Sequence, residues 1–201
     1  TFVATKFKDG TVEEMTASIE TSLKALKTDY VDLIQLHSAT TVDGIRDARV
    51  LETLERAKKE GKARFAGFTT HRNETELVAE AARMGFYDVV LVAYNFQKPQ
   101  ELGTAIAEAA KAGIGIVAMK TQAGGYADHA WKLSPHQAAL KWVLQNPGVA
   151  STIPSMVNYT QLEENVQVMG SSMGWLDRKT LHRYGQAIGG RLCRMCDRCS
   201  G

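Results

Sequence analysis

Short apolar runs alternate with segments of helical periodicity along all 201 residues of the chain. Near-continuous runs such as "VDLIQL", "DVVLVAYNF" and "IGIVAMK" are typical of parallel strands that are buried on both faces of a sheet. Between them, apolar positions recur every three to four residues, as on one face of a helix. The pattern predicts six strands, at Phe2–Lys6, Val31–His37, Ala63–His71, Asp88–Phe96, Ile114–Thr121 and Ala150–Pro154.

The segments between the predicted strands carry helix start signals. Thr11 and Glu14 form a T-x-x-E capping box before an apolar-periodic stretch. Ser134 precedes Pro135, which suits the first helical position because the N–H that proline lacks would be unpaired there anyway. Asn73 is a weaker candidate cap for a further helix. The order of elements therefore alternates strictly between strand and helix.

Six βα units fit either an open doubly wound sheet or a (β/α)₈ barrel. No G-x-G-x-x-G motif follows the first predicted strand, which argues against a dinucleotide-binding Rossmann sheet. The pattern therefore favours the barrel. A barrel of this class has eight strands, and six cannot close without leaving exposed edges. We expect either another α/β fold or a (β/α)₈ barrel of which this chain lacks two βα units.

The sequence changes character after Met169. A short helix is predicted over Asp177–Ala187, followed by a Gly-Gly break and then by all three cysteines of the chain. This stretch does not resemble another βα unit. We therefore predict two parts, a partial barrel over residues 1–169 and a C-terminal appendage over residues 170–201.

Composition narrows the class of protein only a little. A content of 44% hydrophobic and 23% charged residues is average for a globular protein, and a net charge of +2 gives no sign of a nucleic-acid partner or an anionic membrane. No apolar run approaches the roughly 18 residues of a membrane span, and no export signal is visible. We expect a cytoplasmic protein, with export of the folded protein left open.

Two candidate catalytic residues end consecutive predicted strands. Lys6 ends the first strand and His37 ends the second. Because parallel strands of a βα barrel present functional side chains at their C-terminal ends, these two should lie side by side. A strand-ending lysine alone is ordinarily a solvated boundary residue, and a lone histidine is as often structural as catalytic. The pair together favours a catalytic site.

Several longer stretches resemble the aldo-keto reductase family. These are "FVATK" followed by "SLKALKTDYVDLIQLH", then "KKEGKARFAGFTTH", "VVLVAYNF", "SPHQAALKWVLQNPGVASTIPSM" and "QLEEN". The resemblance covers about residues 2–169 and implies a (β/α)₈ barrel that uses NAD(P)H. It also implies that the chain starts at the family's third strand, so that the first two βα units are absent.

The resemblance implies a reaction and two roles. The family reduces a carbonyl to an alcohol, or the reverse, with a tetrad of Asp, Tyr, Lys and His. Its Lys falls on Lys6, which would lower the phenol pKa of the tyrosine, and its His falls on His37, which would hydrogen-bond the substrate oxygen. The Asp and Tyr belong to the two absent units. The expected substrate is a small carbonyl compound or alcohol.

The resemblance also assigns the nicotinamide end of the cofactor site. The family's Ser-Asn pair, which holds the carboxamide, falls on Thr69 and Thr70. Thr69 keeps a hydroxyl, whereas Thr70 lacks the amide. The aromatic residue that stacks on the nicotinamide falls on Met119 or Lys120, and a thioether can still pack on a flat ring.

The adenosine end departs further from the family pattern. Many NADP-dependent members carry Lys and Arg where this chain has Ser155 and Gln161, while Glu164 and Asn165 keep the family's residues. We therefore expect NADH, or no strong preference between NADH and NADPH. Departures such as Thr70 and Gln161 leave an alternative open, a non-catalytic barrel that binds nucleotide or a partner, as the potassium-channel β-subunit relatives do.

The cysteines form the pattern C-x₂-C-x₂-C with Cys193, Cys196 and Cys199. This is the first part of the ferredoxin-type run C-x₂-C-x₂-C-x₃-C-P. It resembles the C-terminal [4Fe–4S] segment of a subset of aldo-keto reductases, whose fourth ligand would fall beyond Gly201. A cluster would imply an electron-transfer partner or a structural clamp. Zinc with His182, a cluster with one open iron, and free thiols on the tail remain alternatives.

Overall fold

The computed structural model describes residues 1–124 and 133–188. Its strands form one six-stranded sheet in which all neighbouring pairs are parallel and the strand order follows the chain. A doubly wound sheet would instead reverse its strand order partway, so the barrel-type arrangement is confirmed. The strands are β1 (Ala4–Phe7), β2 (Val31–Leu36), β3 (Ala63–Thr70), β4 (Val89–Ala93), β5 (Gly115–Met119) and β6 (Val149–Thr152).

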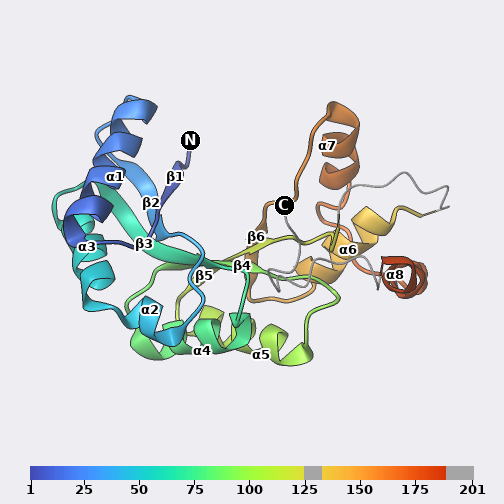
Figure 1. Cartoon of the computed structure of the whole chain (residues 1–201). Coiled ribbons are helices and arrows are strands. Elements are labelled where there is room, and N and C mark those ends of the chain that lie inside the picture. Colours follow the sequence, from blue (N-terminus) through green and yellow to red (C-terminus); the bar gives the residue numbers. More distant parts are fainter. Residues whose placement is uncertain (125–132, 189–201) are drawn as a thin grey trace.

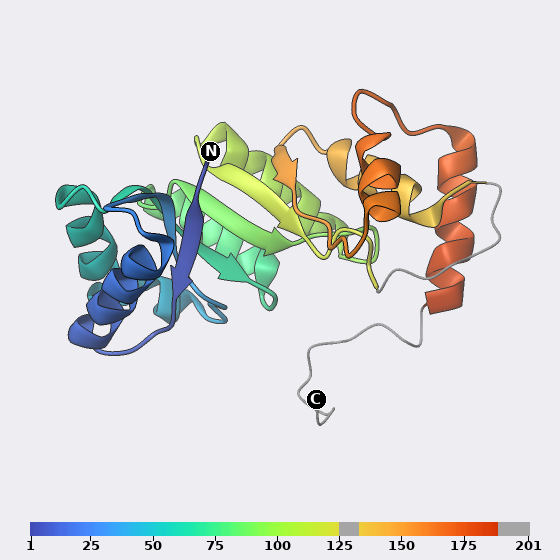
Figure 2. The same ribbon diagram turned by 90° about the horizontal axis from the view of Figure 1, so that it is seen from above.

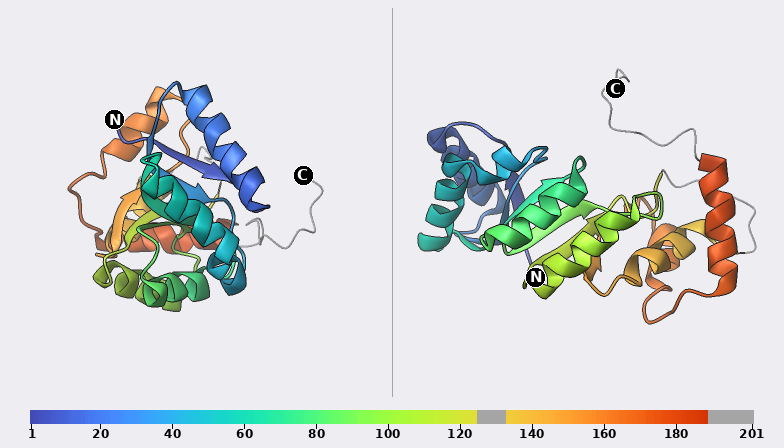
Figure 3. Two further views of the ribbon diagram at one scale, coloured as in Figure 1. Left: turned by 90° about the vertical axis from the view of Figure 1, so that its left-hand side faces the viewer. Right: turned by 90° about the horizontal axis from the view of Figure 1, so that it is seen from below.

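The helices form an outer layer around this sheet (Figure 1). Viewed from the β1 side, the strands lie in the middle, with α1, α3, α4 and α5 outside them (Figure 3, left). The helices are α1 (Val12–Leu26), α2 (Val42–Arg46), α3 (Ala48–Lys59), α4 (Glu74–Met84), α5 (Gln100–Lys111), α6 (Pro135–Leu144), α7 (Tyr159–Val166) and α8 (Trp175–Ile188).

The two faces of the sheet bury different side chains. Leu36, Phe68, Val90 and Ile116 stand opposite one another in register, and all four belong to the main core between strands and helices. On the other face, Leu91, Ala93 and Met119 form a small apolar cluster with Val117. Both faces are therefore apolar, as the near-continuous runs predict.

The helix start signals are mostly confirmed. Thr11 and Glu14 make both hydrogen bonds of the capping box, and the Ser134 hydroxyl accepts from two backbone N–H groups at the start of α6. Asn73 is the N-cap residue of α4, as expected, but its side chain makes no cap hydrogen bond. Its Nδ2 donates to the Thr40 carbonyl at 2.7 Å. Asn73 thus ties the loop after β3 to the loop after β2.

The ends of the expected strands are the least accurate part of the prediction. The first strand is Ala4–Phe7 rather than Phe2–Lys6, and the last is Val149–Thr152 rather than Ala150–Pro154. Both are edge strands, since each pairs with one neighbour among the described residues. Each of these strands is hydrogen-bonded to a neighbouring strand on one side only. The apolar pattern therefore predicts their ends poorly. The short helix α2 was not predicted.

The helix expected after Met169 is present as α8 and is slightly longer than predicted. It packs on α6 through an apolar cluster of Ala138, Ala139, Leu181 and Tyr184. Figure 2 shows α8 at the opposite end of the molecule from α1. The division of the chain at residue 169 stays a prediction. Within residues 1–124 and 133–188, no helix has the length and apolar character needed to cross a membrane.

Candidate active site

Lys6 and His37 lie on neighbouring strands at the same edge of the sheet. Lys6 stands opposite Gln35 in the β1–β2 register, and the His37 backbone N–H donates to the Phe7 carbonyl at 2.8 Å. Both side chains are exposed, and both line a cavity of about 550 Å³. The predicted catalytic pair is therefore brought together at the C-terminal ends of β1 and β2.

The charges at this edge act on the imidazole of His37. Burial lowers the His37 pKa below its usual value of 6.5, and the ammonium groups of Lys6 and Lys8 lower it further. A histidine with a lowered pKa is neutral at pH 7, so one ring nitrogen donates and the other accepts. His37 can then offer a hydrogen bond to an uncharged substrate oxygen.

His71 belongs to the same group of charges, although no role was predicted for it. Burial is the main cause that lowers the His71 pKa, followed by Lys120, His37 and Lys6, while Glu74 opposes them. His71 follows β3 and Lys120 follows β5. The ends of four strands thus bring two imidazoles and two ammonium groups to one edge. The rule that pointed to Lys6 and His37, a polar residue where a strand ends, also applies to His71.

Thr69 and Thr70 face in different directions. The Thr69 hydroxyl accepts from the Ser38 N–H at 2.8 Å, and Thr69 stands opposite Leu91 on the inner face. Thr70 stands opposite Val92, which belongs to the core under the helices. Its hydroxyl donates to the Arg72 carbonyl at 2.7 Å and so closes a local turn. Only Thr69 has its hydroxyl on the face that carries Gln35 and Leu91.

The end of β5 supplies Met119 and Lys120. Met119 is buried in the small apolar cluster of the inner face, whereas the Lys120 side chain is exposed. The Lys120 carbonyl accepts from Asn95 Nδ2 at 3.0 Å, which joins the ends of β4 and β5. At this point of the edge, the buried apolar side chain of Met119 is followed directly by the exposed cation of Lys120.

Strained backbone is concentrated at the same edge. Among the described residues, five non-glycine residues have a positive φ. Lys27 caps a helix, but Ser38 (58°), Asn73 (51°), Lys120 (56°) and Ala123 (56°) all follow strands at their C-terminal ends. Such conformations cost free energy and tend to persist at functional sites, where the surrounding structure holds them in place.

The residues expected at the adenosine end lie in and before α7. Ser155 is exposed, while Gln161 is buried and its Oε1 accepts from the Val157 N–H at 2.8 Å. Burial raises the Glu164 pKa, and the Ser134 hydroxyl donates to its carboxylate. Asn165 is buried, and its Oδ1 accepts from Gln122 Nε2 at 2.8 Å. Three of these four residues are therefore held by hydrogen bonds to neighbouring segments, and Ser155 is exposed.

Three buried polar atoms near this edge have no hydrogen-bond partner among the described residues, namely His71 Nδ1, Thr121 Oγ1 and Asn165 Nδ2. An unpaired buried polar group costs roughly 1–3 kcal/mol, so each one needs an explanation such as a ligand. A polar dinucleotide along the ends of β3, β5 and α7 fits these positions. Thr121 was missed from the sequence, although it directly follows the strand-ending Lys120.

The predicted metal ligands Cys193, Cys196 and Cys199 lie outside the described residues. Within the part of the chain that the structure describes, no group of three or more His, Cys, Asp or Glu residues could hold a metal ion. His182, the alternative zinc ligand, lies on α8, where its Nε2 is 3.1 Å from Gln186 Nε2.

Comparison with known families identifies the family of this chain. The model of the aldo/keto reductase family matches residues 1–130 and 126–173, which is most of the chain. The chain belongs to the aldo/keto reductase family. The match ends before α8 begins.

Individual relatives agree with this assignment. The uncharacterized oxidoreductase YqkF of Bacillus subtilis is 25% identical over 182 residues, which cover 75% of this chain and 58% of that protein. The holo form of aldo-keto reductase AKR11C1 from Bacillus halodurans superposes with a TM-score of 0.71 at 20% identity, covering 90% of this chain and 71% of that one. An aldo/keto reductase from Klebsiella pneumoniae, solved in complex with NADP and acetate, superposes with a TM-score of 0.68 at 20% identity. The match covers 92% of this chain and 70% of that one.

The two solved structures are too distant to show more than a common fold. The chain spans about three fifths of the length of YqkF. It therefore shares the family's fold and sequence pattern, while the activity of the whole protein has to be argued from the site.

The electrostatic coupling between Lys6 and His37 gives a first prediction. In the ligand-free protein, NMR titration of the His37 ring protons should give a midpoint below 6.5. Replacing Lys6 by Gln should move that midpoint upward, because one positive charge that disfavours the imidazolium is removed. Burial and Lys8 should still keep it below 6.5. Lys24→Gln, an equal charge change on the exposed face of α1, should leave it in place. A His37 midpoint that does not respond to Lys6→Gln contradicts the coupling.

Proposed function

We propose that this chain carries the active-site edge of an NAD(P)H-dependent oxidoreductase that interconverts a small carbonyl compound and its alcohol. The observation that carries the proposal is the pairing of Lys6 and His37 at the ends of β1 and β2, beside a cavity and within a cluster of positive charge. The reductase family to which the chain belongs supports the same reaction.

His37 and Lys6 have distinct roles in this proposal. The neutral His37 donates a hydrogen bond to the substrate oxygen, which orients the carbonyl carbon for reaction. The Lys6 ammonium stabilises the negative charge that develops on that oxygen, and it lowers the pKa of a neighbouring proton donor. When bound, a nicotinamide would supply the hydride to the carbonyl carbon, and the proton of the alcohol would come from the neighbouring donor whose pKa Lys6 lowers, the tyrosine of the family tetrad. The Asp and Tyr of the family tetrad are not assigned to residues of this chain.

The cofactor contacts follow from where the structure puts each candidate. We propose that Thr69 and Met119 line the nicotinamide end, since both face the inner side of the sheet. Lys120 is the cation nearest in sequence to Met119 and is available for a phosphate. Thr70 contributes indirectly, through the turn that contains His71, because its hydroxyl donates to the Arg72 carbonyl.

The adenosine end is formed by Ser155, Gln161, Glu164 and Asn165 in this proposal. Asn165 retains an unpaired Nδ2 for a ligand acceptor. Gln161 holds the loop before α7 through Val157 and carries no charge. Glu164 is bonded to Ser134 and so supports the site from the α6 side.

The proposed roles predict a separation between turnover and cofactor binding. The test uses a version of the protein that also carries the Asp and Tyr of the family tetrad, with 4-nitrobenzaldehyde as a probe substrate and cofactor absorbance as the readout. In it, Lys6→Ala and His37→Ala should each lower kcat by about 10²–10³, the size expected for removing one stabilising group at a developing oxyanion. The dissociation constant of the cofactor should change little. Lys59→Ala, on the exposed side of α3, is the charge-matched control. Unchanged turnover in either active-site variant refutes the assigned roles. Dinucleotide binding without any turnover in the wild type supports the non-catalytic alternative.

The lack of charge at Ser155 and Gln161 predicts weak discrimination between the two dinucleotides. The dissociation constants of NADH and NADPH should agree within about tenfold, because no charged hydrogen bond, worth about 1.5–3 kcal/mol, is available from either residue. Ser155→Lys adds an ammonium at an exposed position and should strengthen NADPH binding at least about tenfold while leaving NADH unchanged. Ser172→Lys, an equal change beyond α7, is the control. A wild-type preference of a thousandfold would be inconsistent with this account.

The cysteine segment is proposed to bind a [4Fe–4S] cluster through Cys193, Cys196 and Cys199, on the strength of the ferredoxin-type spacing alone. Anaerobically purified protein should contain iron and sulfide and show broad visible absorbance that Cys196→Ser abolishes. Stoichiometric zinc would instead support the zinc alternative with His182, and protein that binds neither metal would support free thiols. The electron-transfer partner and the cytoplasmic location stay predictions from the sequence.

A further inference from the structure

Helix α8 lies beyond the last residue that the family model matches, yet it contacts the edge that carries the proposed cofactor site. The side chain that makes this contact is Tyr184, which is 1% exposed. Its hydroxyl donates to the Gln122 carbonyl at 3.1 Å. Its ring packs against Phe96 and against the edge of His136, each with a centroid distance of 5.7 Å. Tyr184 thus contacts the loop after β5 from α8.

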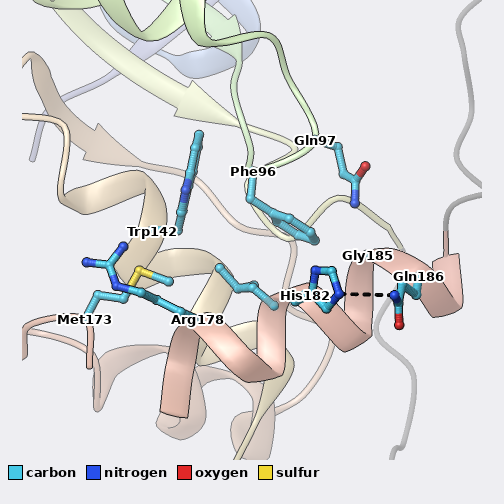
Figure 4. Close-up of a pocket in the computed structure, with 9 residues that line it drawn as sticks. Phe96, Gln97, Trp142, Met173, Arg178, His182, Gly185 and Gln186 are labelled. Carbon is cyan, nitrogen blue, oxygen red and sulfur yellow. Dashed lines mark hydrogen bonds between the residues drawn. The ribbon is translucent and has the colours of Figure 1, made fainter. Parts of the chain in front are cut away.

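The backbone of α8 comes close to the loop after β4. A Cβ on Gly185 would lie 2.7 Å from Gln97 Nε2 and 3.3 Å from the Phe96 ring, so a larger residue here would require the Gln97 side chain to move. Figure 4 shows the Phe96 ring directed toward α8, beside Gly185. At the other end of the helix, the buried carboxylate of Asp177 accepts from Lys141 Nζ at 3.2 Å. Both ends of α8 are therefore fixed to the body of the protein.

The contact continues from Gln122 to the adenosine end of the site. Gln122 Nε2 donates to Asn165 Oδ1 at 2.8 Å, and the two residues are 7% and 6% exposed. Because Oδ1 is held by this bond, the amide of Asn165 cannot flip without losing it, and Nδ2 keeps one direction. That Nδ2 is the atom that has no partner among the described residues. Three side chains thus connect α8, the loop after β5, and α7.

We propose that Tyr184 is a positioning residue for the dinucleotide site, acting through Gln122 on the Asn165 amide. The inference rests on the proposed function, because it assumes that Asn165 contacts the adenosine end. The loop between them is held in an unusual conformation, with Lys120 and Ala123 both at φ 56°. Strained backbone persists where the surrounding structure holds it, and the hydrogen bond from the Tyr184 hydroxyl to the Gln122 carbonyl is one contact that holds this loop.

The coupling works in both directions. If a seated α8 improves dinucleotide binding, then a bound dinucleotide must stabilise the seat of α8 by the same free energy. The first cysteine of the C-x₂-C-x₂-C segment, Cys193, follows five residues after α8 ends at Ile188. A bound dinucleotide should therefore stabilise the packing of α8, the helix that precedes the cysteine segment in the chain.

Replacing Tyr184 by Phe tests the proposal, since it removes the hydroxyl and keeps the ring packing. A hydrogen bond contributes about 0.5–1.5 kcal/mol, so the dissociation constant of NADP⁺, measured by calorimetry, should rise about 3- to 10-fold. Tyr94→Phe is the matched control. Tyr94 is also buried, but its hydroxyl accepts from Asn146 Nδ2 at 3.3 Å and so is bonded to a residue outside the Gln122–Asn165 connection. This control should lower stability to a similar degree and leave the dissociation constant unchanged.

A double-mutant cycle identifies the route of the effect. In an Asn165→Ala background, Tyr184→Phe should cause no further loss of NADP⁺ affinity, because the group through which it acts is gone. A purely structural role of Tyr184 would instead give the same loss in both backgrounds, which overturns the proposal. Equal affinities of Tyr184→Phe and Tyr94→Phe overturn it as well, while the proposed function stands. Wild-type protein that binds no dinucleotide would refute the proposed function itself, and the positioning role with it.

Discussion

Parallel pairing of consecutive strands is the constraint on which the rest of this structure depends. Because each strand returns through a helix to lie beside its predecessor, the C-terminal ends of all strands meet at one edge. The hydrogen bond from the His37 N–H to the Phe7 carbonyl fixes where β1 and β2 end relative to each other. Lys6 and His37 are neighbours for that reason, although 30 residues, including α1 and β2, separate them in the chain. The same constraint brings in Thr69, His71 and Lys120.

Bringing these polar and charged side chains to one edge of the sheet costs free energy, which contacts elsewhere in the structure offset. Burial lowers the pKa of both His37 and His71, and nearby ammonium groups lower it further, those of Lys6 and Lys8 for His37 and those of Lys120 and Lys6 for His71. The loops that follow the strands take strained conformations at Ser38, Asn73 and Lys120. Hydrogen bonds between neighbouring loops, such as Asn73 to Thr40, hold them in place. An edge that carries several cationic and hydrogen-bonding groups suits an electron-rich ligand. The phosphates of a dinucleotide and the oxygen of a carbonyl substrate are electron-rich groups.

The sequence predicts the part of this arrangement that depends on local patterns. Apolar runs mark the strands because both faces of the sheet are buried, and the residue after each run marks the active edge. Asn73 is the N-cap that the pattern indicates, but its side chain bonds to a neighbouring loop rather than to its own helix, which a local pattern does not reveal. The Tyr184–Gln122–Asn165 connection could not be predicted, since its bonds join residues 62 and 43 positions apart and leave no periodic signal. Cofactor contacts are least predictable from the sequence where this chain departs from the family pattern, as at Thr70.

The account stands on the claim that the C-terminal edge of the sheet is where a nicotinamide dinucleotide binds. A crystal structure of the protein with NADP⁺ tests this most directly. The account predicts a nicotinamide ring over Met119, its carboxamide within hydrogen-bond distance of the Thr69 hydroxyl, and an adenosine end that accepts from Asn165 Nδ2. A dinucleotide bound at the opposite ends of the strands, or outside the reach of Lys6 and His37, would contradict it.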